Sequence, residues 1–338
     1  MQQLPSEPRV LWRIKSGDGL ASPVVASGRV FHLDNQNGKE TLHAFNAANG
    51  QSLWSHTLDD AFKDSQSTAG PRCTPLVDGD RVYAQSCRGE LRCLDAKDGN
   101  LLWRVHYVTN FRAVFIGERG QAAGAARHGY NGQPVIDGPH LISIAGGTNG
   151  ATGASIVCLD KQTGTVVWQS QHDTAAYAPP IVADLGGRRQ VIAFTVESLL
   201  AVDRLDGRLL WHVPLKTTFG RHVTTPVVVD GMVMVSSHEF GLIGVRVTAD
   251  AGVLRASVSW TNKAAAINFA SPVAIGSHLY GVGPSKDLVC IETTTGKTAW
   301  TREGFFTSSA SKAHAGLVVM GSNLLVLTDA GELVLVAG

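Results

Sequence analysis

The chain has 338 residues, of which 44% are hydrophobic, only 17% are charged and 37 are glycine, and its formal net charge is +1. So small a net charge gives no general electrostatic attraction to nucleic acid or to an anionic membrane surface. No apolar run reaches the roughly 18 residues of a membrane-spanning helix, and the many glycines favour short strands joined by tight turns.

One short pattern recurs along the chain, and its clearest copy is Leu91 to Trp103, LRCLDAKDGNLLW. Apolar residues alternate up to Asp95, a turn containing Gly99 follows, and Trp103 comes four residues after that glycine. Alternation indicates a half-buried strand, and Asp-Gly suits a turn with positive φ. The pattern therefore predicts a β-hairpin whose second strand carries an aromatic anchor. Further copies stand at 42–54, 156–168, 199–211 and 288–300.

A second pattern, a proline that opens an apolar run and a turn, precedes these hairpins. The strand-opening prolines, which are 46 to 59 residues apart, are Pro23, Pro75, Pro134, Pro180, Pro226 and Pro272. Two hairpins per repeat make four strands, and four-stranded units at this period are typical of a β-propeller.

The blade count follows from the seven tryptophans. Trp12 comes too early to end a complete repeat, whereas the last repeat, Gly316 to Ala337, has three expected strands and no tryptophan. We therefore predict one all-β domain over residues 1–338: a seven-bladed β-propeller of four-stranded antiparallel blades, in which Val10 to Lys15 closes the last blade as its outer strand. Blade five lacks the Asp-x-x-x-Gly phrase, so its outer two strands should be longer. The expected blades are 22–58, 73–108, 133–172, 177–215, 222–262, 268–302, and 307–338 with 9–16.

The five cysteines are expected to be mostly structural. Cys93, Cys158 and Cys290 share one repeat position that alanine holds in other copies, which indicates small buried thiols. Because these three lie on different blades, no metal site is expected from them. A disulfide among Cys73, Cys87 and Cys93 stays open as an alternative.

Candidate binding residues come from the connections between blades. In a propeller the first strand of each blade lines the central channel, so the residues just before each opening proline should ring one mouth of it. The segment 106–132 is much longer than usual connections and should form an ordered partial lid there. The mouth candidates are Arg72, His128, Tyr130, Asn131, Tyr177, Arg221, His222, Asn268, Phe269 and His314, with Lys312 nearby.

This ring of basic and aromatic residues suits a small anionic ligand or a protein partner, and the alternative is a hydrated rim without a ligand. The glycine-rich turn 145–154 is expected to be a hairpin loop, since no helix follows it and no lysine stands where a phosphate cradle needs one. No zinc, Cys-x-x-Cys or Gly-x-Ser-x-Gly motif is present, so the catalytic residues stay unknown.

The hairpin phrases CLDKQTGTVVW, at 158–168, and CIETTTGKTAW, at 290–300, resemble the repeats of pyrroloquinoline-quinone (PQQ) propellers, A-x-D-x-x-T-G-x-x-x-W. The resemblance covers the whole chain and implies that the tryptophans dock between neighbouring blades. One branch of that family, the quinoprotein alcohol dehydrogenases, usually has eight blades, binds PQQ with Ca²⁺ over the channel and typically has two adjacent cysteines, which this chain lacks. The other branch contains BamB-like outer-membrane assembly scaffolds and related exported bacterial propellers.

Three functions are therefore expected in order of preference. The first is a non-catalytic, exported, periplasmic scaffold without a cofactor, which binds a protein partner or a small anionic ligand at the channel mouth. The second is a quinone-dependent dehydrogenase with PQQ and Ca²⁺, and the third a hydrolase or lyase that uses His128, His222 or His314. The N-terminus, MQQLPSEPRV, shows no signal peptide, so the export expectation rests on the resemblance alone.

Overall fold

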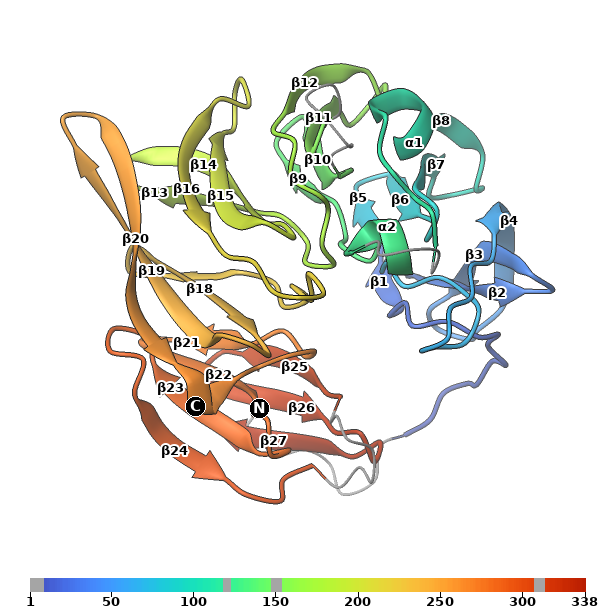
Figure 1. Ribbon diagram of the computed structural model, residues 1–338. Coiled ribbons are helices and arrows are strands. Elements are labelled where there is room, and N and C mark those ends of the chain that lie inside the picture. Colours follow the sequence, from blue (N-terminus) through green and yellow to red (C-terminus); the bar gives the residue numbers. More distant parts are fainter. Residues whose placement is uncertain (1–8, 118–122, 147–153, 307–313) are drawn as a thin grey trace. The chain divides into compact units, whose positions relative to one another are not determined.

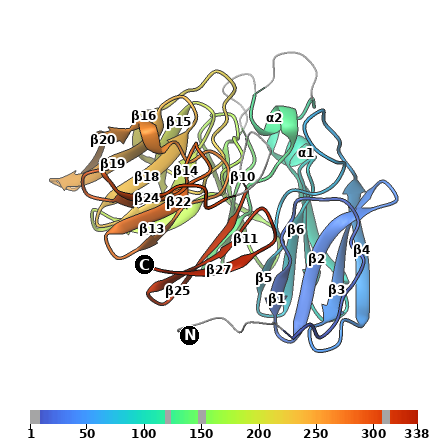
Figure 2. The same ribbon diagram turned by 90° about the horizontal axis from the view of Figure 1, so that it is seen from below.

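The computed structural model describes residues 9–117, 123–146, 154–306 and 314–338. These residues form almost only antiparallel β-structure, in which the strands of each sheet follow one another in chain order (Figures 1 and 2). They divide into two compact units, here called the N-terminal unit, 9–180 with 205–208, and the C-terminal unit, 181–204 with 209–338.

The N-terminal unit holds three four-stranded sheets among its described residues. Their strands are β1 (Val24–Ala26), β2 (Arg29–Gln36), β3 (Lys39–Asn46) and β4 (Ser52–Asp60); β5 (Leu76–Asp78), β6 (Arg81–Gln85), β7 (Glu90–Asp95) and β8 (Leu101–His106); and β9 (Val135–Asp137), β10 (His140–Ile144), β11 (Ile156–Asp160) and β12 (Val166–Ser170). The long segment after β8 contains the short helices α1 (Tyr107–Phe111) and α2 (Ala125–His128).

The C-terminal unit holds three four-stranded sheets and one three-stranded sheet within the described chain. Their strands are β13 (Ile181–Leu185), β14 (Arg188–Phe194), β15 (Ser198–Asp203) and β16 (Leu209–Pro214); β17 (Val227–Val229), β18 (Met232–Ser237), β19 (Gly241–Asp250) and β20 (Val253–Asn262); β21 (Val273–Ile275), β22 (His278–Val282), β23 (Leu288–Glu292) and β24 (Thr298–Arg302); and β25 (Gly316–Met320), β26 (Asn323–Leu327) and β27 (Leu333–Ala337). A 3-10 turn, η1 (Lys263–Ala265), follows β20.

Seven consecutive antiparallel sheets match the blades of a seven-bladed β-propeller, which confirms the predicted fold class. The expected longer strands of blade five are present, because β19 and β20 have 10 residues each. Most of the glycine-rich turn, 147–153, and Lys312 lie outside the described residues. That the whole chain forms one domain stays a prediction.

The structure differs from the prediction at the last blade. The sheet β25–β26–β27 has three strands, and Val10 to Lys15 is not a strand. Side-chain contacts to the first sheet hold this segment: the Trp12 indole N–H donates to the Ala47 carbonyl at 2.9 Å, and the Gly17 N–H donates to the Asp34 carboxylate at 2.7 Å. The predicted closing strand is therefore replaced by an irregular segment that is hydrogen-bonded to the first sheet.

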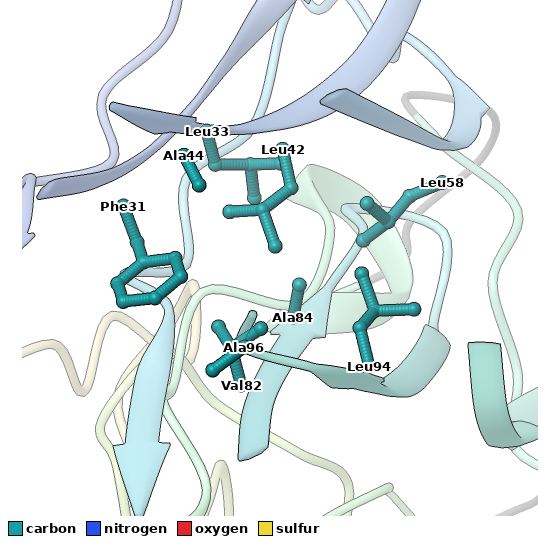
Figure 3. Close-up of a cluster of buried hydrophobic side chains, with 9 residues drawn as sticks. All are labelled: Phe31, Leu33, Leu42, Ala44, Leu58, Val82, Ala84, Leu94 and Ala96. Atoms are coloured by element: carbon teal, nitrogen blue, oxygen red, sulfur yellow. The ribbon is translucent and has the colours of Figure 1, made fainter. Parts of the chain in front are cut away.

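Neighbouring sheets pack through alternating apolar side chains. Phe31 and Leu33 of β2 face Val82 of β6 and Leu94 of β7 in one buried cluster (Figure 3). Residues two apart on a strand share a face, so Phe31 and Leu33 of β2 point to the same neighbour, whereas inner strands such as β6 and β7 are buried on both faces. These packed pairs of sheets form the cores on which the connecting loops rest.

Several of the repeated tryptophans bind the next sheet in the chain. The Trp54 indole N–H donates to the Ala96 carbonyl at 3.2 Å, and the Trp103 indole N–H donates to the Lys161 carbonyl at 3.0 Å. Trp211 is different, since its indole N–H donates to Gln190 in its own sheet. In the following blade the β19–β20 turn contains Gly252, but no ring or other atom lies within 4 Å of a methyl group placed there.

Candidate functional site

The ten predicted mouth residues fall into two groups, one in each unit. The N-terminal unit contains Arg72, His128, Tyr130, Asn131 and Tyr177, and the C-terminal unit contains Arg221, His222, Asn268, Phe269 and His314. In each group some side chains contact one another, and others are buried in the hydrophobic core.

In the N-terminal unit, Arg72 and His128 meet on a third residue, Asp64. The Arg72 guanidinium and the His128 Nδ1 each lie 2.8 Å from the same Asp64 carboxylate oxygen, Oδ2. Arg72 also donates to the His128 carbonyl, which ties the connector before β5 to the loop that contains α2. All three side chains are largely buried, with exposures of 6%, 2% and 14% for Arg72, Asp64 and His128.

Asp64 is the residue that the sequence analysis missed. Burial raises the pKa of its carboxyl group, but hydrogen bonds from Arg72, the Gln66 amide and His128 outweigh burial, so the pKa lies well below its ordinary value. Its other oxygen, Oδ1, accepts from the amides of Gln66 and Ser67, both at 2.9 Å. This is an Asx turn, and the local sequence Asp-Ser-Gln-Ser was the signal that could have revealed it.

The aromatic residues of this group belong mainly to the core. Tyr130 is 2% exposed and meets the Tyr107 ring edge-on, with centroids 5.0 Å apart. The Tyr107 hydroxyl, also missed, lies 2.6 Å from both the Gln85 amide oxygen and the Ser143 hydroxyl. Burial raises the pKa of Tyr130, so its phenol stays neutral. Tyr130 is therefore a packing residue, not a ring face open to a ligand.

Two further mouth residues of the N-terminal unit remain polar or aromatic neighbours of the cluster. The Tyr177 ring lies 6.2 Å from the His128 ring, centroid to centroid. The buried amide oxygen of Asn131 finds no hydrogen-bond partner among the described residues.

In the C-terminal unit, His222 is a core residue. Its side chain is fully buried, and its ring stacks on Phe194 with centroids 4.1 Å apart and planes 4° apart. Its Nδ1 contacts the Thr195 carbonyl and its Nε2 lies 3.3 Å from the Thr217 hydroxyl. Burial lowers the pKa of His222 to about 4, so the imidazole is neutral near pH 7. A buried neutral ring bonded to a backbone carbonyl organises the loop before β17.

That loop presents its neighbours to solvent. The Arg221 guanidinium lies 4.9 Å from the centroid of the Phe219 ring, which is 48% exposed. The Thr218 amide donates to the Glu239 carboxylate at 2.8 Å, and this bond holds the loop 217–222 against the turn that contains Glu239. Phe219 was not predicted as a site residue, although an exposed aromatic beside an arginine is typical of binding surfaces.

Of the last three candidates, Phe269 and His314 form a separate contact. The rings of Phe269 and His314 lie 5.5 Å apart, centroid to centroid, and His314 is exposed. The amide oxygen of Asn268 is buried and has no hydrogen-bond partner within the described chain.

Three further observations concern the described residues as a whole. All five cysteines are free and buried, as expected for Cys93, Cys158 and Cys290. No group of three or more His, Cys, Asp or Glu side chains in the described ranges is placed to hold a metal ion. None of the helices in those ranges is long and apolar enough to cross a membrane.

Comparison with known proteins places these features in a family. A family model described as "Outer membrane protein assembly factor BamB" matches residues 5–116 and 38–302. The BamB of Moranella endobia is 23% identical over 266 residues, which cover 76% of this chain and 64% of that protein. The BamB of Shewanella oneidensis is 22% identical over 324 residues, which cover 92% and 64%. The chain thus spans less than two thirds of the length of these relatives.

Solved structures with the same fold include another BamB and an alcohol dehydrogenase. BamB from Moraxella catarrhalis matches with a TM-score of 0.62 at 17% identity, over 96% of this chain and 82% of that one. A quinohemoprotein alcohol dehydrogenase from Pseudomonas putida matches with a TM-score of 0.58 at 14% identity, over 90% and 61%. At these identities the likeness shows the fold alone. The family model covers more than half of the sequence, and the chain therefore belongs to the PQQ-like propeller family described as outer membrane protein assembly factor BamB.

Proposed function

We propose that this chain is a non-catalytic scaffold that binds a protein partner, in the manner of an outer membrane protein assembly factor. Family membership supports this proposal, and one structural observation carries it. Two of the three candidate catalytic histidines are committed to internal contacts: Asp64 holds His128 together with Arg72, and His222 is buried and neutral. Such pairing stabilises loops and leaves their outer surfaces to make contacts.

We further propose that the docking surface includes the loop 217–222. Phe219 offers exposed apolar area, and Arg221 stacks on it with its charge near solvent. The Glu239 bond to the Thr218 amide holds the loop in place, so little conformational entropy is lost on binding. The partner would be a protein surface with an apolar pocket and a carboxylate. The family relation supports export to the periplasm as the place of this contact.

Site-specific photo-crosslinking in a Gram-negative host that lacks its own BamB tests this proposal. The chain is exported with a host signal sequence, and a photo-reactive phenylalanine analogue replaces Phe219 or, as the control, Val253, which is also exposed and lies in the β19–β20 hairpin of the same unit. We expect crosslinks to the outer-membrane assembly machinery from position 219 only, and their loss in Arg221→Glu. Equal crosslinking from both positions, or none, would contradict the proposed docking surface.

The dehydrogenase alternative has weaker support from the described residues. PQQ carries carboxylates, but the Arg72 charge is already neutralised by Asp64, and that carboxylate is in turn occupied by Arg72 and His128 instead of being open to Ca²⁺. Native mass spectrometry of the purified chain with and without PQQ and Ca²⁺ separates the two functions. The scaffold proposal predicts no mass shift, whereas a stoichiometric complex with dye-linked alcohol oxidation would overturn it.

A further inference from the structure

The turn between β6 and β7 connects the first blade to the loop that contains α2. The Ser86 hydroxyl donates to the Asp59 carboxylate of β4 at 2.8 Å. The Cys87 carbonyl, one residue further, accepts from the Tyr130 amide at 3.0 Å. Tyr130 lies two residues after His128, so a movement of this turn is passed directly to the loop whose His128 binds Asp64.

Glu40 of β3 bonds to the same turn from a fully buried position. One of its carboxylate oxygens, Oε2, accepts from the Cys87 amide at 3.1 Å. The other, Oε1, is buried without a hydrogen-bond partner among the described residues. Asp59 lies directly opposite on β4, which places two acidic side chains side by side. Burial raises the pKa of Glu40 to about 7, the Cys87 and Phe62 amides oppose this rise, and Asp59 adds to it.

We propose that Glu40 is a pH-responsive latch, which keeps the β6–β7 turn closed on the loop of His128 when protonated and loosens that turn when ionised. A buried carboxylate with one unpaired oxygen and an acidic neighbour is poorly solvated. Opening of the turn lets water reach that oxygen, so ionisation favours the open arrangement. The Cys87–Tyr130 bond then carries the change to the loop.

The other titratable groups around the turn do not supply this response. The thiols of Cys73 and Cys87 have a pKa raised by burial, with Glu40 adding to the rise, so both stay protonated. Arg72 is the positive charge that acts on Cys87, and its guanidinium is already bonded to an acidic side chain. Asp59 faces Glu40 with a like charge and adds to the rise in the Glu40 pKa that burial causes.

The sign of the effect follows from the two pKa values. A carboxyl group whose pKa is about 7 in the closed state and 4.5 when unperturbed stabilises the closed state fully below the lower value. This stabilisation is lost as the pH rises to the higher value. The equilibrium constant for opening therefore increases by up to about tenfold per pH unit between these values and is constant above them.

Hydrogen exchange of the full chain, observed by NMR at the Cys87 and Tyr130 amides between about pH 5 and pH 8, measures this opening. Expressed as protection factors, so that the intrinsic pH dependence of exchange is removed, the wild-type protection should fall up to about 100-fold from pH 5 to pH 7 and then level. In Glu40→Gln the protection should not vary with pH. In Asp59→Asn the fall should end at a lower pH, because the like charge is gone.

The Val82 amide, near the start of β6, is the internal control, because a local change at the β6–β7 turn leaves it unchanged. An equal fall at Val82, or the same pH dependence in Glu40→Gln as in the wild type, would overturn the latch. If Glu40→Gln does not fold, Asp59→Asn tests the proposal alone. The latch is overturned if the pH at which protection stops falling is the same in Asp59→Asn as in the wild type. No partner is present in this assay, so its outcome is independent of the proposed docking surface.

Discussion

Two glycines in the second blade allow the packing of a repeated tryptophan to be separated from backbone strain. Both have positive φ, +59° at Gly79 in the β5–β6 turn and +77° at Gly99 in the β7–β8 turn. A methyl group added at Gly79 meets no atom within 4 Å, whereas one added at Gly99 lies 2.6 Å from the nearest carbon of the Trp54 ring. Alanine therefore brings strain at the first position, and strain with a steric clash at the second.

The expected magnitudes follow from these contacts. Alanine in the left-handed region costs about 1 kcal/mol at either position. At Gly99 the ring must shift, which adds about 1–3 kcal/mol of overpacking. The shift also weakens the bond from the Trp54 indole to the Ala96 carbonyl, worth about 1 kcal/mol. We expect Gly79→Ala to lower the free energy of unfolding by about 1 kcal/mol and Gly99→Ala by about 3 kcal/mol.

Urea denaturation followed by tryptophan fluorescence measures both losses. A double-mutant cycle with Trp54→Ala removes the clash, so the cost of Gly99→Ala in that background should fall to that of Gly79→Ala. Equal destabilisation by the two alanines in the wild-type background would refute the reasoning. So would a cost at Gly99 that persists without the ring.

Three further substitutions test the loops. Tyr107→Phe should lower the free energy of unfolding by about 1–3 kcal/mol in urea, because two buried partners lose their hydrogen bond. Arg72→Met should lower the free energy of unfolding by about 3–5 kcal/mol at pH 7, because the buried Asp64 carboxylate loses its main cation. Thermal unfolding compares this variant with the double variant that also carries Asp64→Asn, which should recover part of the loss. Burial lowers the pKa of His222 from 6.5 to about 4, so the free energy of unfolding should fall as the pH drops from 6.5 to 4. The same dependence of stability on pH in His222→Gln would contradict this prediction.

Particular residues show why some site predictions succeeded and others did not. The long segment 106–132 added His128 to the predicted mouth, and the repeat pattern placed Arg72 just before an opening proline. The structure brings these two side chains together on one carboxylate. His222 was predicted by the same rule, but a full stack on Phe194 puts it in the core. The rule locates the backbone position within a blade and carries no information on which way a side chain turns.

The partner residues Asp64 and Glu40 could not be predicted from the sequence for a related reason. Asp64 is 64 residues from His128, and Glu40 is 47 residues from the Cys87 amide that it binds. Such pairs have no common period, because connectors between blades differ in length and composition. Only their approach in space identifies them, although the Asx turn at Asp64 is a local signal.

By itself, the sequence determined the strands, the turns and the repeated tryptophan anchors, because alternation of apolar residues and glycines with positive φ act over a few neighbouring residues. The tertiary structure alone decided which buried polar groups meet and how residues 10–15 are held. Hydrogen bonds and ion pairs between separate loops depend on the packing of whole sheets, and that packing sums many weak apolar contacts that no single stretch of sequence contains.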